Sequence, residues 1–523
     1  MSVTSALKEK LRPHQIKPVS DLLEILGSHR TAADFSDTGT GKTYVAAAVA
    51  KALALPTLVI VPKIAINQWH RAAEHFDDTL SVINYEMLRT GRTPYGKWDN
   101  NPPIGRASNE YFVCVHCQQR VDMERYHPCY THPAGIHCLD TKKKPWRYGN
   151  FHFNPAVKLV IFDEGHRCGA LDSLNADLMI AARRDVPKGL VLTATAACSP
   201  LQMWAMGYFL DVHTLDHDVL LPGRKLRSNF YNWAARYGVR REPMRGLQWR
   251  VGAERQLEVM TDIRREIIPA RGVRVCVDDI PGFPEREITS ELYDLDEIDK
   301  INGLYDEMAV ALSNLERIQM DDLCPEHPLT RILRARQKIE LLKVPIGVEL
   351  ARDFVAKGYS VGLFVNFRQT LDALRERLGL KCIIDGSPAG QRNRQKSIDA
   401  FQSDSERMIG VNNEAGGLAL SLPDLHGNHP RVGLVFPSEK AKTMRQIFGR
   451  FHRDGSKSKC FYRVILAANT YETSMHRNLR NKLNNLDALN DADLQPDNLV
   501  LTKSVIQPTN YLTTQSINGS LVT

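Results

Sequence analysis

A glycine-containing octapeptide near the start of the chain constrains its fold most strongly. It reads Ser36-Asp37-Thr38-Gly39-Thr40-Gly41-Lys42-Thr43, after the apolar run Ala32–Phe35 and before an alanine-rich helical sequence. A loop in this setting can wrap a phosphate, because glycines let backbone amides point at the anion. We therefore predict a nucleotide site in which Lys42 pairs with the β- and γ-phosphates, Thr43 binds Mg²⁺, and Thr38, Gly39, Thr40 and Gly41 line the phosphates. A chance glycine-rich turn is the alternative, since Ser36 stands where the strict motif has glycine.

Two carboxylates follow the apolar run KLVIF at 158–162, as Asp163-Glu164-Gly165-His166. If this run is a buried strand, both carboxylates lie at its carboxyl end, where ligands of open α/β sheets bind. We expect Asp163 to hold Mg²⁺, directly or through water, and Glu164 to orient and deprotonate an attacking water. The alternative is a solvated acidic turn, which the octapeptide upstream disfavours.

Short apolar runs alternate with helical patterns in two parts of the chain. The runs lie at 57–61, 158–162 and 189–193 in the first part, and at 360–365, 381–385, 407–411, 432–436 and 461–466 in the second. Strands that helices cover on both faces read as continuous apolar runs. The pattern predicts an α/β fold with two parallel-sheet domains.

The domain boundaries follow from changes in composition along the chain. We predict a first domain over 1–225, interrupted by an insertion at 92–150 that is rich in Pro, Gly, Asn, His and Cys. A connector at 226–345 is rich in Arg and Glu, has little strand character and carries an amphipathic helical stretch at 292–315. The second domain covers 346–480, and a polar tail covers 481–523.

Composition excludes several classes of protein. With 523 residues, 43% of them hydrophobic and 24% charged, the chain exceeds one domain of roughly 150 residues and is neither collagenous nor mostly disordered. Its net charge of +8 is compatible with a polyanionic partner. The ten cysteines are too few for a disulfide scaffold, and no signal segment or membrane span stands out. We expect an intracellular protein, of the cytoplasm or nucleoid if a bacterium or phage encodes it, without membrane association.

Several segments together resemble the superfamily 2 helicases and translocases over nearly the whole chain. The matching segments are Leu11–Gln15, Val61–Lys63, Asn84–Glu86, Asp163–His166, Thr193–Thr195, Leu363–Phe367, Ala415–Leu418 and Gln446–Arg453. Those of the second domain look most like the Swi/Snf group of double-stranded DNA translocases, including annealing helicases, although Ala419 and Ser421 depart from the group's pattern. The resemblance implies two RecA-like domains of the P-loop NTPase class.

The resemblance also implies roles for single residues. Gln15 is the expected contact to the adenine base, with Arg12 in the same motif. His166 and Gln446 are expected at the nucleotide, and Lys63 at the nucleic acid. The cofactors implied are ATP and Mg²⁺.

Arg450 and Arg453 stand at the spacing of one helical turn. Both could reach toward a γ-phosphate held by the other domain, where guanidinium groups stabilise the charge of the transition state. An exposed basic helix face is the alternative for these two residues.

The insertion has the composition of a zinc site. Cys114 and Cys117 have the spacing of two adjacent ligands of a tetrahedron, and Cys129 with Cys138 completes the set, with His132 as the alternative to Cys138. Four protein ligands leave no open position, so we expect structural Zn²⁺ and not a catalytic ion. Reduced, unligated cysteines are the other interpretation.

A basic segment with an aromatic residue follows the cysteines. Lys142, Lys143 and Lys144 could pair with phosphates, and Trp146 could stack on a base. A solvated charged loop is at least as frequent an outcome for such a run.

Together these features predict an ATP-dependent translocase or helicase that acts on duplex or branched DNA. An RNA helicase of the same superfamily is one alternative. The other is an ATP-dependent switch or assembly scaffold that binds nucleic acid without moving along it.

Overall fold

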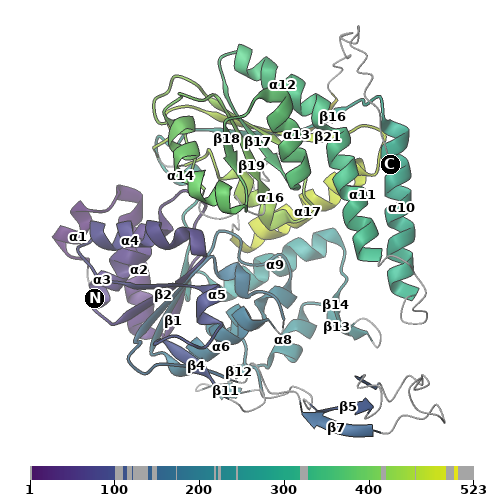
Figure 1. Cartoon of the computed structure of the whole chain (residues 1–523). Helices are drawn as coiled ribbons and strands as arrows, with labels where there is room; N and C mark the ends of the chain where they lie inside the picture. The colour runs from purple at the N-terminus through teal and green to yellow at the C-terminus, as the bar shows by residue number, and fades with distance from the viewer. Residues whose placement is uncertain are drawn as a thin grey trace. The chain divides into compact units, whose positions relative to one another are not determined.

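The computed structural model describes residues 3–99, 110–114, 120–121, 139–143, 150–171, 173–216, 219–221, 225–242, 246–317, 328–413, 420–453, 455–490 and 500–503. Two compact units make up the chain (Figure 1). Unit 1 comprises Met1–Gly282 with Leu483–Leu494, and unit 2 comprises Phe283–Lys482 with Gln495–Thr523.

Unit 1 contains a six-stranded sheet in the order β15-β1-β10-β9-β2-β3. Its strands, all paired in parallel, are β1 (Thr31–Asp34), β2 (Thr57–Val61), β3 (Ser81–Asn84), β9 (Leu159–Asp163), β10 (Lys188–Leu192) and β15 (Gly272–Val273). Parallel strands need crossovers, which helices supply here. The helices are α1 (Ser5–Glu9), α2 (Pro13–Ser28), α3 (Lys42–Leu53), α4 (Ile66–His75), α5 (Tyr85–Leu88), α6 (Leu174–Asp185), α7 (Trp204–Phe209), α8 (Phe230–Arg236) and α9 (Ala253–Ile267).

Unit 2 contains a seven-stranded sheet in the order β18-β19-β17-β20-β21-β16-β22, also paired in parallel. The strands are β16 (Arg286–Tyr293), β17 (Ser360–Val365), β18 (Cys382–Ile384), β19 (Met408–Asn412), β20 (Arg431–Val435), β21 (Cys460–Ala467) and β22 (Val500–Lys503). The helices are α10 (Ile298–Arg317), α11 (Pro328–Leu342), α12 (Val344–Ala356), α13 (Arg368–Leu378), α14 (Pro388–Gln402) and α16 (Ala441–Phe448). The helix α17 (Glu472–Asn490) begins in unit 2, and its residues from Leu483 onward are assigned to unit 1.

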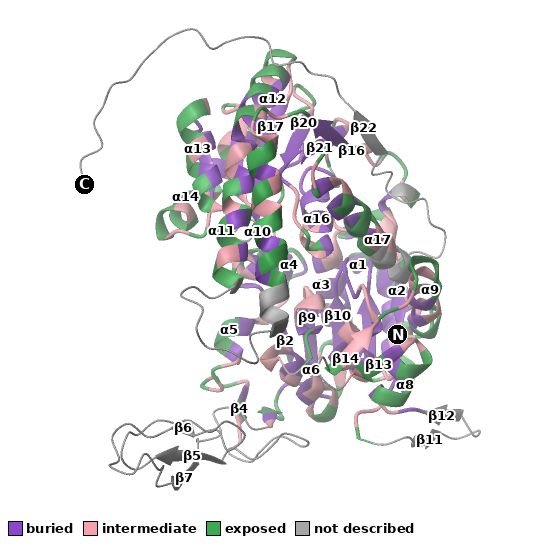
Figure 2. Cartoon of the chain, turned by 90° about the vertical axis from the view of Figure 1, so that its right-hand side faces the viewer, coloured by how far each residue is buried: buried purple, intermediate pink, exposed green. Residues whose placement is uncertain are grey.

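The cores of both units explain the continuous apolar runs. Every residue of β1, β2, β17 and β20 is buried, and Figure 2 shows the sheet strands as buried while the helices expose their outer faces. Helices on both faces of a parallel sheet leave no strand position in water. The prediction of two parallel-sheet α/β domains is therefore confirmed. In the described part of the chain, we find no helix with the length and apolar character of a membrane span.

The interval 226–345 differs from the expected helical connector. It holds strands as well as helices, and the unit boundary divides it at Gly282. β15 extends the sheet of unit 1 beside β1, while β16 pairs along its length with β21 in unit 2. The amphipathic stretch begins at Ile298 and not at Leu292, because residues up to Tyr293 belong to β16. Neither strand has the continuous apolar run that identified the others, because β15 is only two residues long and β16 mixes charged with apolar residues.

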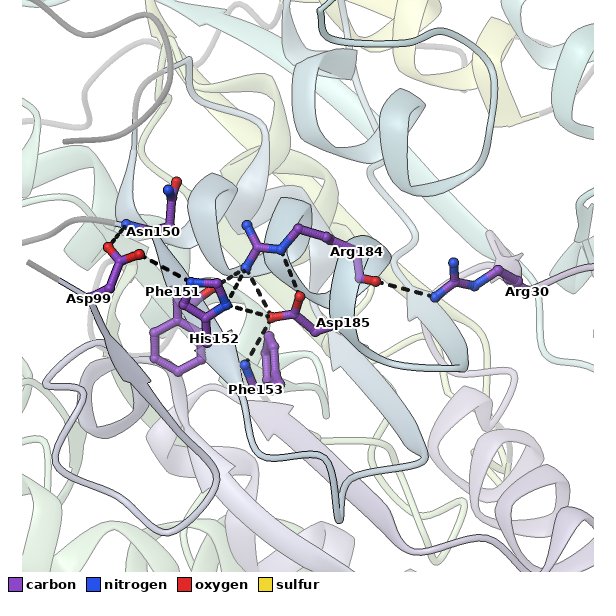
Figure 3. A network of polar contacts seen from close by, with 8 residues as sticks. All are labelled: Arg30, Asp99, Asn150, Phe151, His152, Phe153, Arg184 and Asp185. Carbon is purple, nitrogen blue, oxygen red and sulfur yellow. Dashed lines mark hydrogen bonds and ion pairs between the residues drawn. The ribbon is translucent and has the colours of Figure 1, made fainter. Parts of the chain in front are cut away.

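Two short strands form a stem at the base of the insertion. β4 (Gly96–Trp98) pairs antiparallel with β8 (Phe151–Phe153), so the chain leaves and returns at one place. Asp99 accepts hydrogen bonds from the Asn150 backbone N–H (2.8 Å) and lies 3.2 Å from His152 Nε2. On α6, Asp185 accepts from the Phe153 backbone N–H (Figure 3). Polar contacts thus tie both ends of the insertion to unit 1. Beyond the stem the backbone of β5 (Glu110–Cys114), β6 (Arg120–Val121) and β7 (Leu139–Lys143) forms a small antiparallel sheet.

A buried ion pair fixes the core of unit 2 and gives the first testable prediction. Lys343 Nζ donates to Glu472 Oε1 at 2.7 Å, and both side chains are at most 3% exposed. Replacing Lys343 by Met leaves a buried carboxylate without its cation, so we expect a loss of about 3 kcal/mol in the free energy of unfolding. The matched control is Arg336→Ala, which removes an exposed pair with Glu439 and should cost less than about 1 kcal/mol.

Hydrogen exchange of peptides from β21 and α17 measures this effect. Tryptophan fluorescence would miss it, because all six tryptophans precede residue 283. Equal protection in Lys343→Met and Arg336→Ala would contradict the prediction.

Candidate active site at the carboxyl edge of the first sheet

The octapeptide forms a tight loop between β1 and α3. Gly39 and Gly41 adopt φ angles of +95° and +87°, in the region that favours glycine, and Gly41 is the N-cap of α3. A Cβ at Gly41 would lie 2.1 Å from Gln15 Nε2. Both the backbone angle and the close approach of Gln15 therefore require glycine at position 41.

Lys42 lies in the first turn of α3, and its side chain contacts this loop. Its Nζ donates to the carbonyl oxygens of Ser36 and Asp37, each at 2.8 Å. The ammonium thereby lies against the carbonyls of a loop that leads into a helix N-terminus, the setting that favours phosphate. The residues fit the β- and γ-phosphates of a nucleotide.

The outer side of the loop is held by residues 273–277. Ser36 Oγ accepts from the Val275 N–H at 3.0 Å, and the carboxylate of Asp37 pairs with Arg274 at 2.9 Å and accepts from the Val277 N–H at 3.1 Å. The Ser36 hydroxyl thus has a structural partner, which accounts for serine where the strict motif has glycine. The octapeptide alone could not predict the contact with Arg274, because Arg274 lies more than two hundred residues downstream.

Gln15 lies against the same loop from α2. It is buried, its Nε2 donates to the Thr40 carbonyl at 3.1 Å, and its Oε1 accepts from the Arg12 N–H at 3.1 Å. His14 Nε2 is 3.0 Å from the same carbonyl. The motif containing Arg12 and Gln15 is therefore joined to the phosphate loop, and the contact of Gln15 with adenine stays a prediction.

Asp163 is the last residue of β9, and each of its two carboxylate oxygens accepts a hydrogen bond. The Glu164 N–H donates to Oδ1 at 2.9 Å and Trp69 Nε1 donates to Oδ2 at 2.8 Å, while Tyr85 OH donates to the Asp163 carbonyl at 2.8 Å. Burial, and then the neighbouring Glu164, raise the pKa of Asp163 to about 6, and the indole N–H and Lys42 oppose that rise.

Glu164 and His166 connect this strand end to the end of β10. Glu164 adopts φ +51°, and its Oε2 lies 3.2 Å from His166 Nδ1. The same ring nitrogen lies 3.1 Å from the hydroxyls of Thr193 and Thr195. The carboxylate that we assign as base is thus linked through one imidazole to the Thr-Ala-Thr segment.

The oxygen donors at this edge suit Mg²⁺. Thr43 offers a hydroxyl and Asp163 a carboxylate, the hard oxygen ligands that this ion takes together with phosphates. Asp34, at the end of β1, is fully buried, accepts from the Ser36 N–H at 2.9 Å and keeps a second buried oxygen without a hydrogen-bond partner. Burial raises the pKa of Asp34 and Lys42 opposes the rise, as it does at Asp163. Lys42 therefore lies close to both acidic strand ends.

The structure thus brings together the residues predicted for unit 1. These are Gln15, Thr38, Gly39, Thr40, Gly41, Lys42, Thr43, Asp163, Glu164 and His166. Lys63 is exposed at the start of the short 3-10 helix Lys63–Ala65. Sequence reasoning missed Gln68, Trp69 and Arg274, because the role of each depends on a hydrogen bond to a residue far along the chain.

The arginines of unit 2 depart from the expected helical spacing. α16 ends at Phe448, so Arg450 and Arg453 lie in the following turn and not on a helix face. Both donate to the Leu420 carbonyl, at 3.0 Å and 3.3 Å, and Arg450 is only 3% exposed. Arg450 is thus a buried residue of this unit. Gln446 lies within α16 itself.

The predicted zinc and nucleic-acid residues mostly lie outside the described residues. This holds for Cys117, Cys129, His132, Cys138, Lys144 and Trp146, and for the segment Ala415–Ala419. Cys114, Lys142 and Lys143 lie on described strands whose side chains are not described. Among the residues that the structure does describe, no cluster of three or more His, Cys, Asp or Glu could hold a metal ion.

Comparison with known proteins gives three findings. A family model described as "Type III restriction enzyme, res subunit" matches residues 8–197. A protein of Acanthamoeba polyphaga mimivirus, provisionally named an ATP-dependent RNA helicase, is 30% identical over 502 residues, which are 94% of this chain and 86% of the mimivirus protein. The structure of S. cerevisiae Dbp5 bound to RNA and ADP BeF3 covers 96% of this chain and 95% of its own, with 10% identity and a TM-score of 0.42, a likeness too weak to carry an argument.

The geometry separates two roles that substitution can test. Lys42→Ala removes the cation on the loop and should abolish ATP hydrolysis, whereas Glu164→Gln keeps the shape of the site and should bind Mg·ATP but not hydrolyse it. Steady-state hydrolysis and binding of a fluorescent ATP analogue measure both effects. Wild-type turnover in Lys42→Ala, or loss of ATP binding in Glu164→Gln, would contradict these assignments.

Proposed function

The chain belongs to the superfamily 2 helicases and is therefore a nucleic-acid-dependent ATPase, and we propose that it uses the site on unit 1 to drive movement along a polynucleotide. The observation that carries the proposal is the meeting of Lys42, Thr43 and Asp163 at one sheet edge, with Glu164 joined to Thr193 and Thr195 through His166. Bound Mg·ATP would supply the phosphoanhydride bond that is broken. Lys42 and the loop amides bind its phosphates, and Glu164 takes the proton of the attacking water.

Arg453 is our candidate for the arginine that stabilises the transition state. It is half-buried, whereas Arg450 is buried and donates to the Leu420 carbonyl from within unit 2. A guanidinium in this role must reach the γ-phosphate, so the more accessible residue suits it better. Arg450 then serves mainly to hold the turn after α16.

Two classes of polynucleotide, RNA and DNA, are candidates for the partner of this ATPase. The name of the mimivirus relative, which matches 94% of the chain, supports RNA. The likeness of Gln446–Arg453 to the Swi/Snf group, together with the restriction-enzyme family over 8–197, supports DNA. The first expectation of duplex DNA thus has no support from the relative that covers most of the chain. The ATPase geometry is common to both candidates, because phosphoryl transfer does not involve the polynucleotide.

The insertion is the second part of the proposal. Structural Zn²⁺ on Cys114, Cys117, Cys129 and Cys138 or His132 would hold the basic segment that follows, and Lys142–Lys144 and Trp146 would then contact nucleic acid. The polar stem of β4 and β8 supports this arrangement, since it gives the insertion a fixed base on unit 1.

An ATPase panel tests the proposed function. Duplex DNA, single-stranded DNA, single-stranded RNA and duplex RNA of equal length are added at one salt concentration, because phosphate contacts make affinity salt-dependent. We expect one class to raise kcat by about tenfold or more, and the stimulating class decides between the two candidates. Displacement of a roadblock in an ATP-dependent manner separates a motor from a stationary switch. ATP hydrolysis that no polynucleotide stimulates would contradict the proposal.

The two arginines give a further prediction. Arg453→Ala should lower stimulated hydrolysis by about a thousandfold and leave the thermal stability of the chain nearly unchanged. Arg450→Ala should instead lower stability by about 2 kcal/mol, because it removes a buried side chain that donates to the Leu420 carbonyl. Thermal unfolding and hydrolysis rates are measured on both variants. Full activity in Arg453→Ala would exclude it from the site.

A further inference from the structure

Two neighbouring side chains of α4 reach both residues that we assign to Mg²⁺. Trp69 Nε1 donates to Asp163 Oδ2 at 2.8 Å, and Gln68 Nε2 donates to Thr43 Oγ1 at 3.2 Å. α4 is the crossover between β2 and β3, so it belongs neither to the phosphate loop nor to the acidic strand end. The same short stretch of one helix therefore contacts the two oxygen ligands, which come from different elements.

The contacts of Asp163 fix the plane of its carboxylate. Trp69 holds one oxygen and the Glu164 N–H holds the other at 2.9 Å. Each carboxylate oxygen has about two lone-pair positions, so each keeps one for another partner. A carboxylate held in this way cannot rotate to present a different edge without losing a hydrogen bond.

Trp69 is itself held firmly. It is fully buried, together with Ala72, Ala73 and Phe76 on the same face of α4 and the turn that follows it. A buried indole N–H needs a partner, and a charged acceptor makes a stronger hydrogen bond than a neutral one. The Trp69 N–H therefore has the Asp163 carboxylate as its partner, and this bond fixes one carboxylate oxygen against the buried face of α4.

We propose that Trp69 and Gln68 are positioning residues that orient Asp163 and Thr43 for Mg²⁺. The inference rests on the proposed ATPase function of this site. Neither residue touches the reacting atoms. The rigid α4 fixes the orientation of both oxygen ligands before the nucleotide binds, so that less ordering remains to be done at binding.

Trp69→Phe tests the indole N–H while keeping an aromatic ring in the core. Trp233→Phe is the matched control, because Trp233 is also fully buried in unit 1 and its Nε1 donates to Glu266 at 3.0 Å, on helices α8 and α9. Both variants lose one indole N–H bonded to a carboxylate, and only Trp69 faces a proposed metal ligand.

The measurement is binding of a fluorescent, non-hydrolysable ATP analogue to the full chain as free Mg²⁺ is varied, with a second titration in EDTA. We expect Trp69→Phe to need about tenfold more Mg²⁺ than wild type, with binding in EDTA unchanged, since outer contacts of metal ligands typically have effects of this size. Trp233→Phe should follow the wild-type curve. A wild-type Mg²⁺ curve in Trp69→Phe, or an equal loss of binding with and without Mg²⁺, would overturn the inference.

Gln68→Ala provides the second variant, in case the buried substitution prevents folding. Gln68 is exposed, so its truncation should leave the fold intact. We expect a smaller shift in the same direction, about threefold. A Gln68→Ala curve that superimposes on wild type would overturn the claim that α4 orients both ligands. The proposed function fails separately, if the wild-type chain shows no Mg²⁺-dependent nucleotide binding at all.

Discussion

The parallel register of three strands in unit 1 determines where the chemistry can occur. Asp34 on β1 lies opposite Leu192 on β10, and Leu192 lies opposite Asp163 on β9, so the carboxyl ends of all three strands are level. A slip of one residue in either pairing would turn the side chain at that end to the other face of the sheet. The fully buried residues of these strands, such as Val160, Phe162 and Val191, resist such a slip because it would place each side chain against neighbours of the wrong shape in a close-packed core.

Burial at this edge has an electrostatic consequence. Asp34 is fully buried and Asp163 is half-buried, and burial raises the pKa of each carboxyl. Lys42 offsets that effect at both residues, and it does so while bonded to the carbonyl oxygens of Ser36 and Asp37. One cation therefore opposes the effect of burial at both acidic strand ends. In the proposed nucleotide site, this ammonium would exchange its two carbonyl partners for phosphate oxygens.

The sequence predicted the elements that carry continuous apolar runs and the residues that carry local motifs. The strands at 57–61 and 360–365 have the bounds that their apolar runs indicated, and Lys42, Thr43 and Asp163 meet as expected. β15 and β16 were missed, because one is two residues long and the other mixes charged with apolar residues. Trp69 was missed since its role depends on a hydrogen bond to a residue far along the chain. Spacing alone also misled at Arg450 and Arg453, because α16 ends before them.

The contacts of Asp37 give the phosphate loop a connection that no local motif describes. Its carboxylate pairs with Arg274, whose side chain is 3% exposed, and the same segment donates through the Val275 and Val277 amides to Ser36 and Asp37. The backbones of these two segments are also paired. The Ala33 N–H donates to the Arg271 carbonyl, and the Phe35 N–H donates to the Val273 carbonyl. Residues 271–277 run on along the chain toward Phe283, where unit 2 begins. The octapeptide loop is thus braced by the stretch of chain that leads into the second unit, and a displacement of that stretch acts directly on Ser36 and Asp37.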